Sequence, residues 1–144
     1  MRTKRRIANV HKSLYLSMEQ CRKHVKERFN LLFNQEDLPI TFDQWLILNE
    51  VAENNEINQK TVAKNLSKEV ASVSRILTKL VNMQLVIRRS NPENMRESNL
   101  FLTPDGTVLI ERIEGFESKE FKSIFFNIYE QELNLVIDVL RRIE

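Results

Sequence analysis

The chain has 144 residues, of which 42% are hydrophobic and 29% are charged, an ordinary balance for one globular domain. Two glycines and three prolines are too few for sandwiches or barrels with many tight turns, so long helices are favoured. No apolar run approaches the roughly 20 residues that cross a bilayer, and the single cysteine excludes an internal disulfide and a cysteine-based zinc site. The basic start, MRTKRRIANVHKS, lacks the apolar block of a secretory signal, so we expect a cytoplasmic protein without a membrane partner.

The charge is unevenly distributed along the chain. The formal net charge is +2, but residues 58–98 carry a net +5 and residues 99–144 a net −4. This asymmetry predicts a surface for a polyanion in the middle of the chain. A second basic cluster at the N-terminus is interpreted either as a DNA contact or as a disordered tail; it consists of Arg2, Lys4, Arg5 and Arg6.

The first half of the chain reads as three helices. Apolar residues at three- and four-residue steps predict a long helix over 7–34, which Pro39 terminates. The segment TFDQ matches a capping box in which Thr41 and Gln44 open a second helix. A short third helix follows Asn58, a good N-cap residue.

The second half contains a helix, a hairpin and two more helices. Residues 69–83 have helical periodicity, and two short strands are expected at 85–90 and 98–102 around a turn rich in Asn and Pro. LTPDG opens the next helix, because Thr103 can cap it and proline fits the first helical position. A last amphipathic helix carries Leu133, Val136, Ile137, Leu140 and Ile143.

The helices at 60–66 and 69–83 have the spacing of a helix-turn-helix, in which the second helix lies in the major groove of DNA. Val70, Val73, Leu77 and Leu80 are predicted to anchor the second helix in the core. The opposite face carries small, hydroxyl and cationic side chains that suit bases and phosphates. These candidate DNA-binding residues are Lys68, Ala71, Ser72, Ser74, Arg75, Thr78 and Lys79.

The two strands are expected to form a wing beside this helix. Asn94 and Arg96 lie near its tip, where an arginine can enter a narrow minor groove. Arg88 and Arg89 lie at its base and complete the predicted DNA-binding set.

Three segments resemble the MarR family of bacterial winged helix-turn-helix regulators. VAKNLSKEVASVSRILTKLVNMQLVIRR is similar to the family's third helix, recognition helix and first wing strand. LPITFDQWLILNEV resembles its entry to the second helix, and NPENMRESNLFLTPDG resembles its wing and exit. The chain departs from the family pattern at three positions: Asn94 stands where Asp is usual, Gln84 where Gly is frequent, and Lys68 where an apolar residue is frequent. Because Gln84 replaces a glycine, this helix end must close differently or be strained.

The resemblance implies a mostly α single domain over 1–144. Residues 41–102 would form the winged helix-turn-helix with its β-hairpin wing, and residues 1–38 and 103–144 the helical dimerisation region. It also implies a homodimeric transcriptional regulator that binds a pseudo-palindromic operator on double-stranded DNA. Such a regulator is a repressor more often than an activator, and a small ligand or an oxidant releases it from the DNA. The alternative is a winged-helix module that binds another protein and no DNA.

The remaining candidates favour ordinary structural roles. Tyr15 and Trp45 could line an effector pocket, but core packing is the preferred interpretation, and Cys21 is expected to be a buried structural cysteine. His11 and His24 are too far apart along one helix for a metal site. With no phosphate-binding glycine loop and no nucleophile–base pair, we predict neither a cofactor nor an enzymatic activity.

Overall fold

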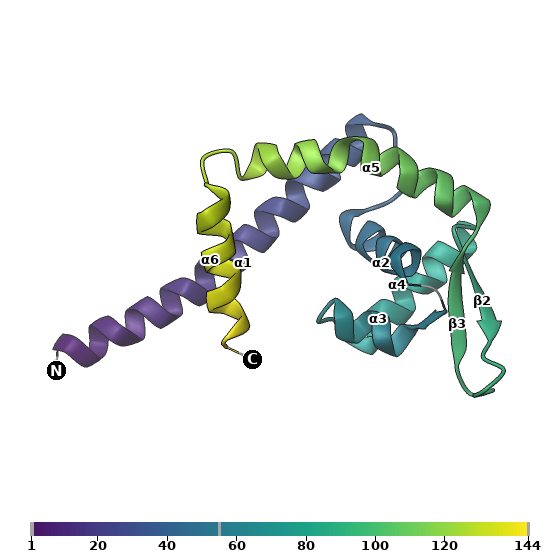
Figure 1. Ribbon diagram of the computed structural model, residues 1–144, viewed down its shortest axis with the longest axis horizontal. Helices are drawn as coiled ribbons and strands as arrows, with labels where there is room; N and C mark the ends of the chain where they lie inside the picture. The colour runs from purple at the N-terminus through teal and green to yellow at the C-terminus, as the bar shows by residue number, and fades with distance from the viewer. Residues whose placement is uncertain (1, 55, 144) are drawn as a thin grey trace. The chain divides into compact units, whose positions relative to one another are not determined.

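The computed structural model describes residues 2–54 and 56–143, with side chains from residue 9 onward (Figure 1). The side chains of the N-terminal basic cluster therefore lie outside the described part. The elements are α1 (Arg2–Gln35), α2 (Phe42–Glu53), β1 (Ile57–Asn58), α3 (Gln59–Asn65), α4 (Val70–Asn82), β2 (Val86–Ser90), β3 (Ser98–Leu102), α5 (Pro104–Ile124) and α6 (Glu130–Arg141). The chain divides into two compact units, Met1–Glu111 and Arg112–Glu144.

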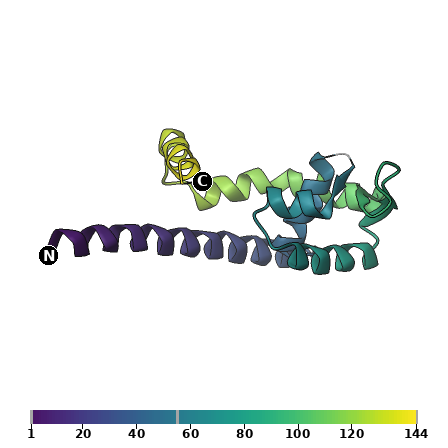
Figure 2. The same ribbon diagram turned by 90° about the horizontal axis from the view of Figure 1, so that it is seen from below.

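The predicted fold class, mostly α with a β-hairpin wing, is confirmed. α1 begins at Arg2, earlier than predicted, and continues as one uninterrupted helix (Figure 2). The sheet has one strand more than the sequence indicated, because β1 pairs antiparallel with β3 and places Ile57 opposite Leu100. Two residues are too few to show a strand periodicity, so only the pairing reveals β1.

Side-chain caps fix the starts of three helices where the sequence predicted them. At α2 the Gln44 amide donates to Thr41 Oγ1 (3.3 Å) and the Thr41 amide donates to Gln44 Oε1 (2.8 Å), which completes the capping box. At α3 the Thr61 amide donates to Asn58 Oδ1 (2.9 Å). At α5 the Gly106 amide donates to Thr103 Oγ1 (3.0 Å). These bonds satisfy amides that have no partner inside the helix.

Left-handed residues other than glycine end three helices. Asp37, Ser67 and Gln84 have φ values of 51°, 50° and 59°. After Gln84, the Leu85 amide donates to the Leu80 carbonyl (3.0 Å), the bond of a Schellman motif. The sequence predicted that this helix end would close differently or be strained, and the strained alternative is the one observed, since a residue with a Cβ pays roughly 1–2 kcal/mol in this conformation.

An aromatic cluster joins α1 to α2. Phe29 stacks on Trp45 with ring centroids 5.3 Å apart and an interplanar angle of 9°, and Phe33 and Phe42 complete the cluster. All four side chains are buried. Trp45 is therefore a core residue, as the preferred interpretation predicted.

A charge cluster makes a second connection between α1 and the helix-turn-helix. Asp43, in the first turn of α2, accepts hydrogen bonds from Lys26 of α1 and from Lys68 of the α3–α4 turn. Burial by itself would raise the pKa of Asp43, but the bonds from the two ammonium groups outweigh burial and hold that pKa below its usual value. The cluster thus connects three segments through one carboxylate.

A close backbone approach joins α4, the wing and α5. Thr103 donates its amide hydrogen to the Leu85 carbonyl (3.1 Å) and its hydroxyl hydrogen to the Gln84 carbonyl (2.6 Å). Gly106 packs so closely that a Cβ at this position would lie 2.2 Å from the Leu85 carbonyl oxygen. Only glycine allows the first turn of α5 to contact the end of α4 at this distance.

Within the described residues, no helix is long and apolar enough to cross a membrane.

We predict that Gly106→Ala destabilises the fold by about 1–3 kcal/mol, because the new methyl group forces Leu85 and the start of the wing apart. The free energy of unfolding, from chemical denaturation, measures this effect. Gly115→Ala in the same helix is the matched control: no atom lies within 4 Å of the added Cβ. The control is expected to gain about 0.5–1 kcal/mol from helix propensity. Equal effects at both positions would contradict the proposed close approach.

We predict that Asp43→Asn destabilises the fold at neutral pH by about 1–2 kcal/mol, because two charge-assisted hydrogen bonds lose their anion. The folded-state pKa of Asp43 lies below the usual 3.8, so its carboxylate stabilises the fold above that pH and this contribution is lost as pH falls through the folded-state pKa. Denaturation midpoints of the two proteins should therefore converge in acid. Glu27→Gln, which removes an exposed ion pair with Lys23, should change stability little at any pH.

Candidate nucleic-acid interface

The recognition helix α4 has one buried face and one exposed face. Val73, Leu77 and Leu80 are fully buried, as predicted. Val70 was predicted to join them, but that prediction is wrong, because 42% of its surface is exposed. Val70 is the first residue of the helix, and periodicity along a sequence does not indicate how far toward the helix end the core extends.

The opposite surface of α4, which we call the recognition face, is free of covering segments in the described chain. Ala71, Arg75, Thr78 and Lys79 are exposed, and Ser72 and Ser74 are half-buried. These six residues define the face, and all were predicted to lie on it. Two cations and several small side chains on one accessible helix surface can enter a groove without steric obstruction.

Hydrogen bonds within the recognition face determine which of its polar groups remain available to bind another molecule. Arg75 Nη2 donates to Ser72 Oγ (3.3 Å), so the two side chains lie side by side. Thr78 donates its hydroxyl hydrogen to the Ser74 carbonyl of the preceding turn (3.0 Å). Thr78 therefore presents an acceptor oxygen and a methyl group, a combination that suits base edges carrying an amino or a methyl group.

Lys68 does not belong to this face. Its Nζ lies 2.9 Å from Asp43 Oδ1, and only 25% of its side chain is exposed. The lysine holds the α3–α4 turn to α2, and its predicted contact with phosphate stays a prediction. The sequence could not indicate this partner, because Asp43 lies 25 residues earlier in the chain.

The wing consists of β2, β3 and the turn between them, and its turn projects beyond the helices (Figure 1). Arg88 pairs with Leu100 and Arg89 with Asn99, so the two arginines point to opposite faces of the sheet. Arg89 lies over the Phe101 ring, 5.2 Å from its centroid. The sequence placed both arginines at the base of the wing, but the pairing register separates them.

Asn94 organises the turn of the wing. Its side-chain oxygen accepts the Arg96 amide (3.2 Å) and its carbonyl accepts the Glu97 amide (2.9 Å). Asparagine thus shapes the tip through hydrogen bonds to the backbone, without the ion pair that an aspartate would allow. The Arg96 side chain is exposed.

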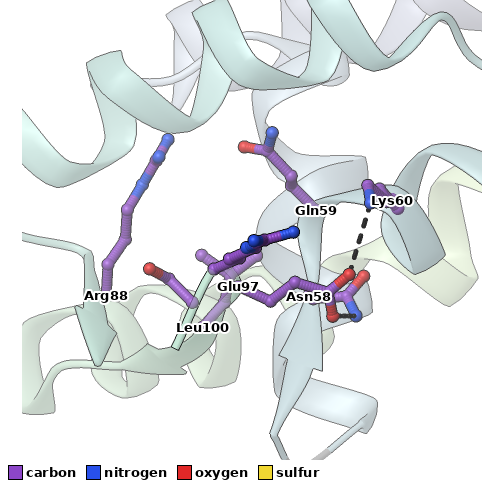
Figure 3. A pocket seen from close by; sticks show the side chains of 8 residues that line it. Asn58, Gln59, Lys60, Arg88, Glu97 and Leu100 are labelled. Atoms are coloured by element: carbon purple, nitrogen blue, oxygen red, sulfur yellow. Dashed lines mark hydrogen bonds and ion pairs between the residues drawn. The ribbon is translucent and has the colours of Figure 1, made fainter. Parts of the chain in front are cut away.

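Arg88 and Arg96 line a polar cavity of about 180 Å³ between the wing and the start of α3. Lys60 and Glu97 also line it, and Figure 3 shows Arg88 on one side, Lys60 on the other and Glu97 bonded to Asn58 and Lys60. Lys60 lies in the basic segment 58–98, but neither Lys60 nor Glu97 was predicted to belong to a site. Contacts across 37 residues leave no local signal in the sequence.

Tyr15 and Trp45, which were suggested to line an effector pocket, do not lie together in the described residues. Trp45 is buried against Phe29, whereas Tyr15 is exposed and lies about 20 Å away from Phe29 along α1. Cys21 was expected to be buried, but it is exposed in the single chain, so that expectation is wrong. Among the described residues of its unit, other segments cover neither Cys21 nor Leu14 of the same helix, whereas Phe29 farther along α1 is fully buried.

Comparison with known proteins gives a consistent family assignment. Residues 40–98 match the MarR family model. The chain is 28% identical over 130 residues to the HTH-type transcriptional regulator FarR of Neisseria gonorrhoeae, covering 90% of this chain and 88% of FarR. Residues 40–98 contain α2, α3, α4, β2 and the turn of the wing, and so include the recognition face of α4.

Two solved structures have the same fold. A mutant of MarR from E. coli, complexed with operator DNA, superposes with a TM-score of 0.83 at 20% identity, covering 94% of this chain and 96% of that one. PcaV from Streptomyces coelicolor, in complex with its natural ligand, superposes with a TM-score of 0.72 at 20% identity, covering 84% of this chain and 86% of that one. Residues 40–98 thus match the MarR family of winged helix-turn-helix, DNA-binding transcriptional regulators, and the two solved structures show that the chain as a whole has the same fold.

Proposed function

We propose that the protein is a homodimeric repressor that acts in the cytoplasm and binds a pseudo-palindromic operator. The single observation that carries this proposal is the recognition face of α4, where Arg75 and Lys79 are exposed while the opposite residues are anchored in the core. A helix with one exposed, cationic face and one buried, apolar face can enter the major groove while the buried face anchors it to the domain.

Each side chain of the recognition face has a role in the proposal. Arg75, placed beside Ser72, reads a guanine edge or binds a phosphate, and Thr78 offers its methyl group and acceptor oxygen to a base. Lys79 neutralises a phosphate, and Ala71 and Ser74 allow the close approach of a base edge. The wing adds Arg96 in the minor groove, with Asn94 shaping the turn and Arg88 and Arg89 binding phosphates on the flank.

The homodimer is supported by apolar surface that each unit leaves uncovered. In α1, Val10, Leu14, Tyr15 and Leu16 are exposed. No residue of α6 is buried in the described chain, although Leu135, Val136, Ile137 and Val139 are large and apolar. Patches of this extent typically mark an interface, and a two-fold dimer would present two recognition helices to two half-sites.

Modulation by a small ligand is supported by the similarity to PcaV, whose structure contains its natural ligand. A ligand that binds preferentially to a dimer with an unsuitable spacing of the recognition helices would lower operator affinity by a population shift.

Fluorescence anisotropy with an operator fragment at several salt concentrations tests the DNA-binding role. We expect affinity to fall steeply as salt rises, and Lys79→Ala to weaken binding to specific and random DNA alike and reduce the salt slope by about one unit. Lys64 is an exposed lysine on α3 outside the recognition face, so Lys64→Ala is the control. Its salt slope should remain larger than that of Lys79→Ala. A loss of affinity confined to one operator sequence would contradict the phosphate role of Lys79, and salt-independent binding would contradict the proposal.

Light scattering coupled to size exclusion tests the dimer. We expect a mass of twice the 17.1 kDa of the chain. Val136→Glu should produce monomers that remain helical, because this valine is 53% exposed in the single chain and its carboxylate would be buried only in the dimer. Gln131→Glu, on the polar side of α6, is the matched control and should remain dimeric. A monomeric wild-type protein would contradict the proposal.

A further inference from the structure

Glu97 connects the wing to the start of α3. Its side chain accepts a hydrogen bond from Asn58 Nδ2 (3.2 Å) at Oε2 and one from Lys60 Nζ (3.3 Å) at Oε1 (Figure 3). These partners lie 39 and 37 residues away in the sequence. The contact therefore adds a side-chain link beside the pairing of β1 with β3, in which Asn58 lies opposite Asn99.

The backbone of Glu97 also closes the turn of the wing. Its amide donates to the Asn94 carbonyl (2.9 Å), and its carbonyl accepts the Asn91 amide (3.0 Å). Arg96 is the residue immediately before it. A constraint on the Glu97 side chain is thus transmitted to the turn that presents Arg96.

Asn58 serves two elements at once. Its Oδ1 accepts the amide and the hydroxyl of Thr61 and caps α3, which leaves its Nδ2 to donate to Glu97. The capping bond therefore determines which way the amide faces. Because only 27% of the Glu97 side chain is exposed, its contact with Asn58 is better shielded from water than its contact with Lys60, whose side chain is 71% exposed.

The charge of Glu97 is unfavourable for binding a polyanion. It lies on the cavity that Lys60, Arg88 and Arg96 line, and a carboxylate there offsets part of the positive potential that attracts phosphates. Any benefit of this side chain to DNA binding must therefore come from geometry, since its electrostatic contribution has the wrong sign.

We propose that Glu97 is a positioning residue for the wing: through Asn58 it fixes the wing turn to α3, so that Arg96 is held at a defined place relative to the recognition helix. This inference rests on the proposed DNA-binding function. Without the contact β1 still pairs with β3, but the turn beyond this pairing loses its side-chain bond to the start of α3, and Arg96 has to be ordered again each time DNA binds.

The test is a double-mutant cycle on operator binding at fixed salt. In the wild-type background, Arg96→Ala should weaken binding by roughly 5- to 150-fold. In a Glu97→Ala background the same change should weaken binding by less than about threefold, because the two residues act through one structural unit. In a Glu97→Gln background the full effect of Arg96→Ala should return, because the amide oxygen of glutamine still accepts from Asn58. Glu97→Gln alone should bind DNA more tightly than the wild type, since it removes the opposing charge.

Two further variants separate the Asn58 contact from the ion pair. Asn58→Ser keeps a good N-cap but is too short to reach Glu97, so it should behave like Glu97→Ala. Lys60→Ala removes the ion pair only and should leave the effect of Arg96→Ala unchanged. Hydrogen exchange without DNA provides an independent readout: the Asn91 and Glu97 amides should exchange faster in Glu97→Ala and at the wild-type rate in Glu97→Gln.

The inference and the proposed function fail in different ways. An equal effect of Arg96→Ala in the wild-type and Glu97→Ala backgrounds overturns the positioning role, even if both proteins bind operator. An Arg96→Ala variant with wild-type affinity also overturns it, while salt-dependent binding through Lys79 would leave the proposed function intact. Circular dichroism of each variant identifies any loss of affinity that reflects unfolding.

Discussion

The structure depends on the junction at which the recognition helix ends. Gln84 adopts a left-handed conformation, and the carbonyl of the next residue, Leu85, accepts the Thr103 amide and lies against the backbone of Gly106. The end of α4, the start of the wing and the first turn of α5 therefore meet within a few ångströms. A change in any one of them moves the other two, because backbone groups in this close contact have no flexible side chain between them to absorb a displacement. The direction of the wing relative to the recognition face follows from this junction.

Lysines of the basic segment have different surroundings, and charge counts alone do not distinguish them. Lys79 is exposed on the recognition face, whereas Lys68 is bonded to a carboxylate between α2 and the α3–α4 turn. The first is available to a polyanion and the second stabilises the domain. Glu97 is the opposite case: it is an acidic residue among the cations Lys60, Arg88 and Arg96, and its hydrogen bond to Asn58 constrains the wing. In a surface of this kind, local geometry decides which charges contribute to binding.

The terminal helices contrast with the winged part in how much they bury. Phe29 and Phe33 of α1 are fully buried among the aromatic residues near α2, while the preceding turns of the same helix leave Val10, Leu14 and Tyr15 exposed. One helix thus has a segment that packs within its own chain and a segment whose apolar side chains lack such packing. Both segments belong to one continuous helix of about 50 Å, so a displacement at one end of this helix is transmitted to the other end.

The sequence by itself determined the order of the helices, the caps at Thr41, Asn58 and Thr103, and the six residues of the recognition face. These features depend on periodicity and on partners three or four residues away, which a sequence shows directly. It did not determine the exposure of Val70 and Cys21, the partner of Lys68, the strand at Ile57 or the contact between Asn58 and Glu97. Each of these is decided by a segment far along the chain or by how far packing extends, because such interactions exist only after the elements have come together in space.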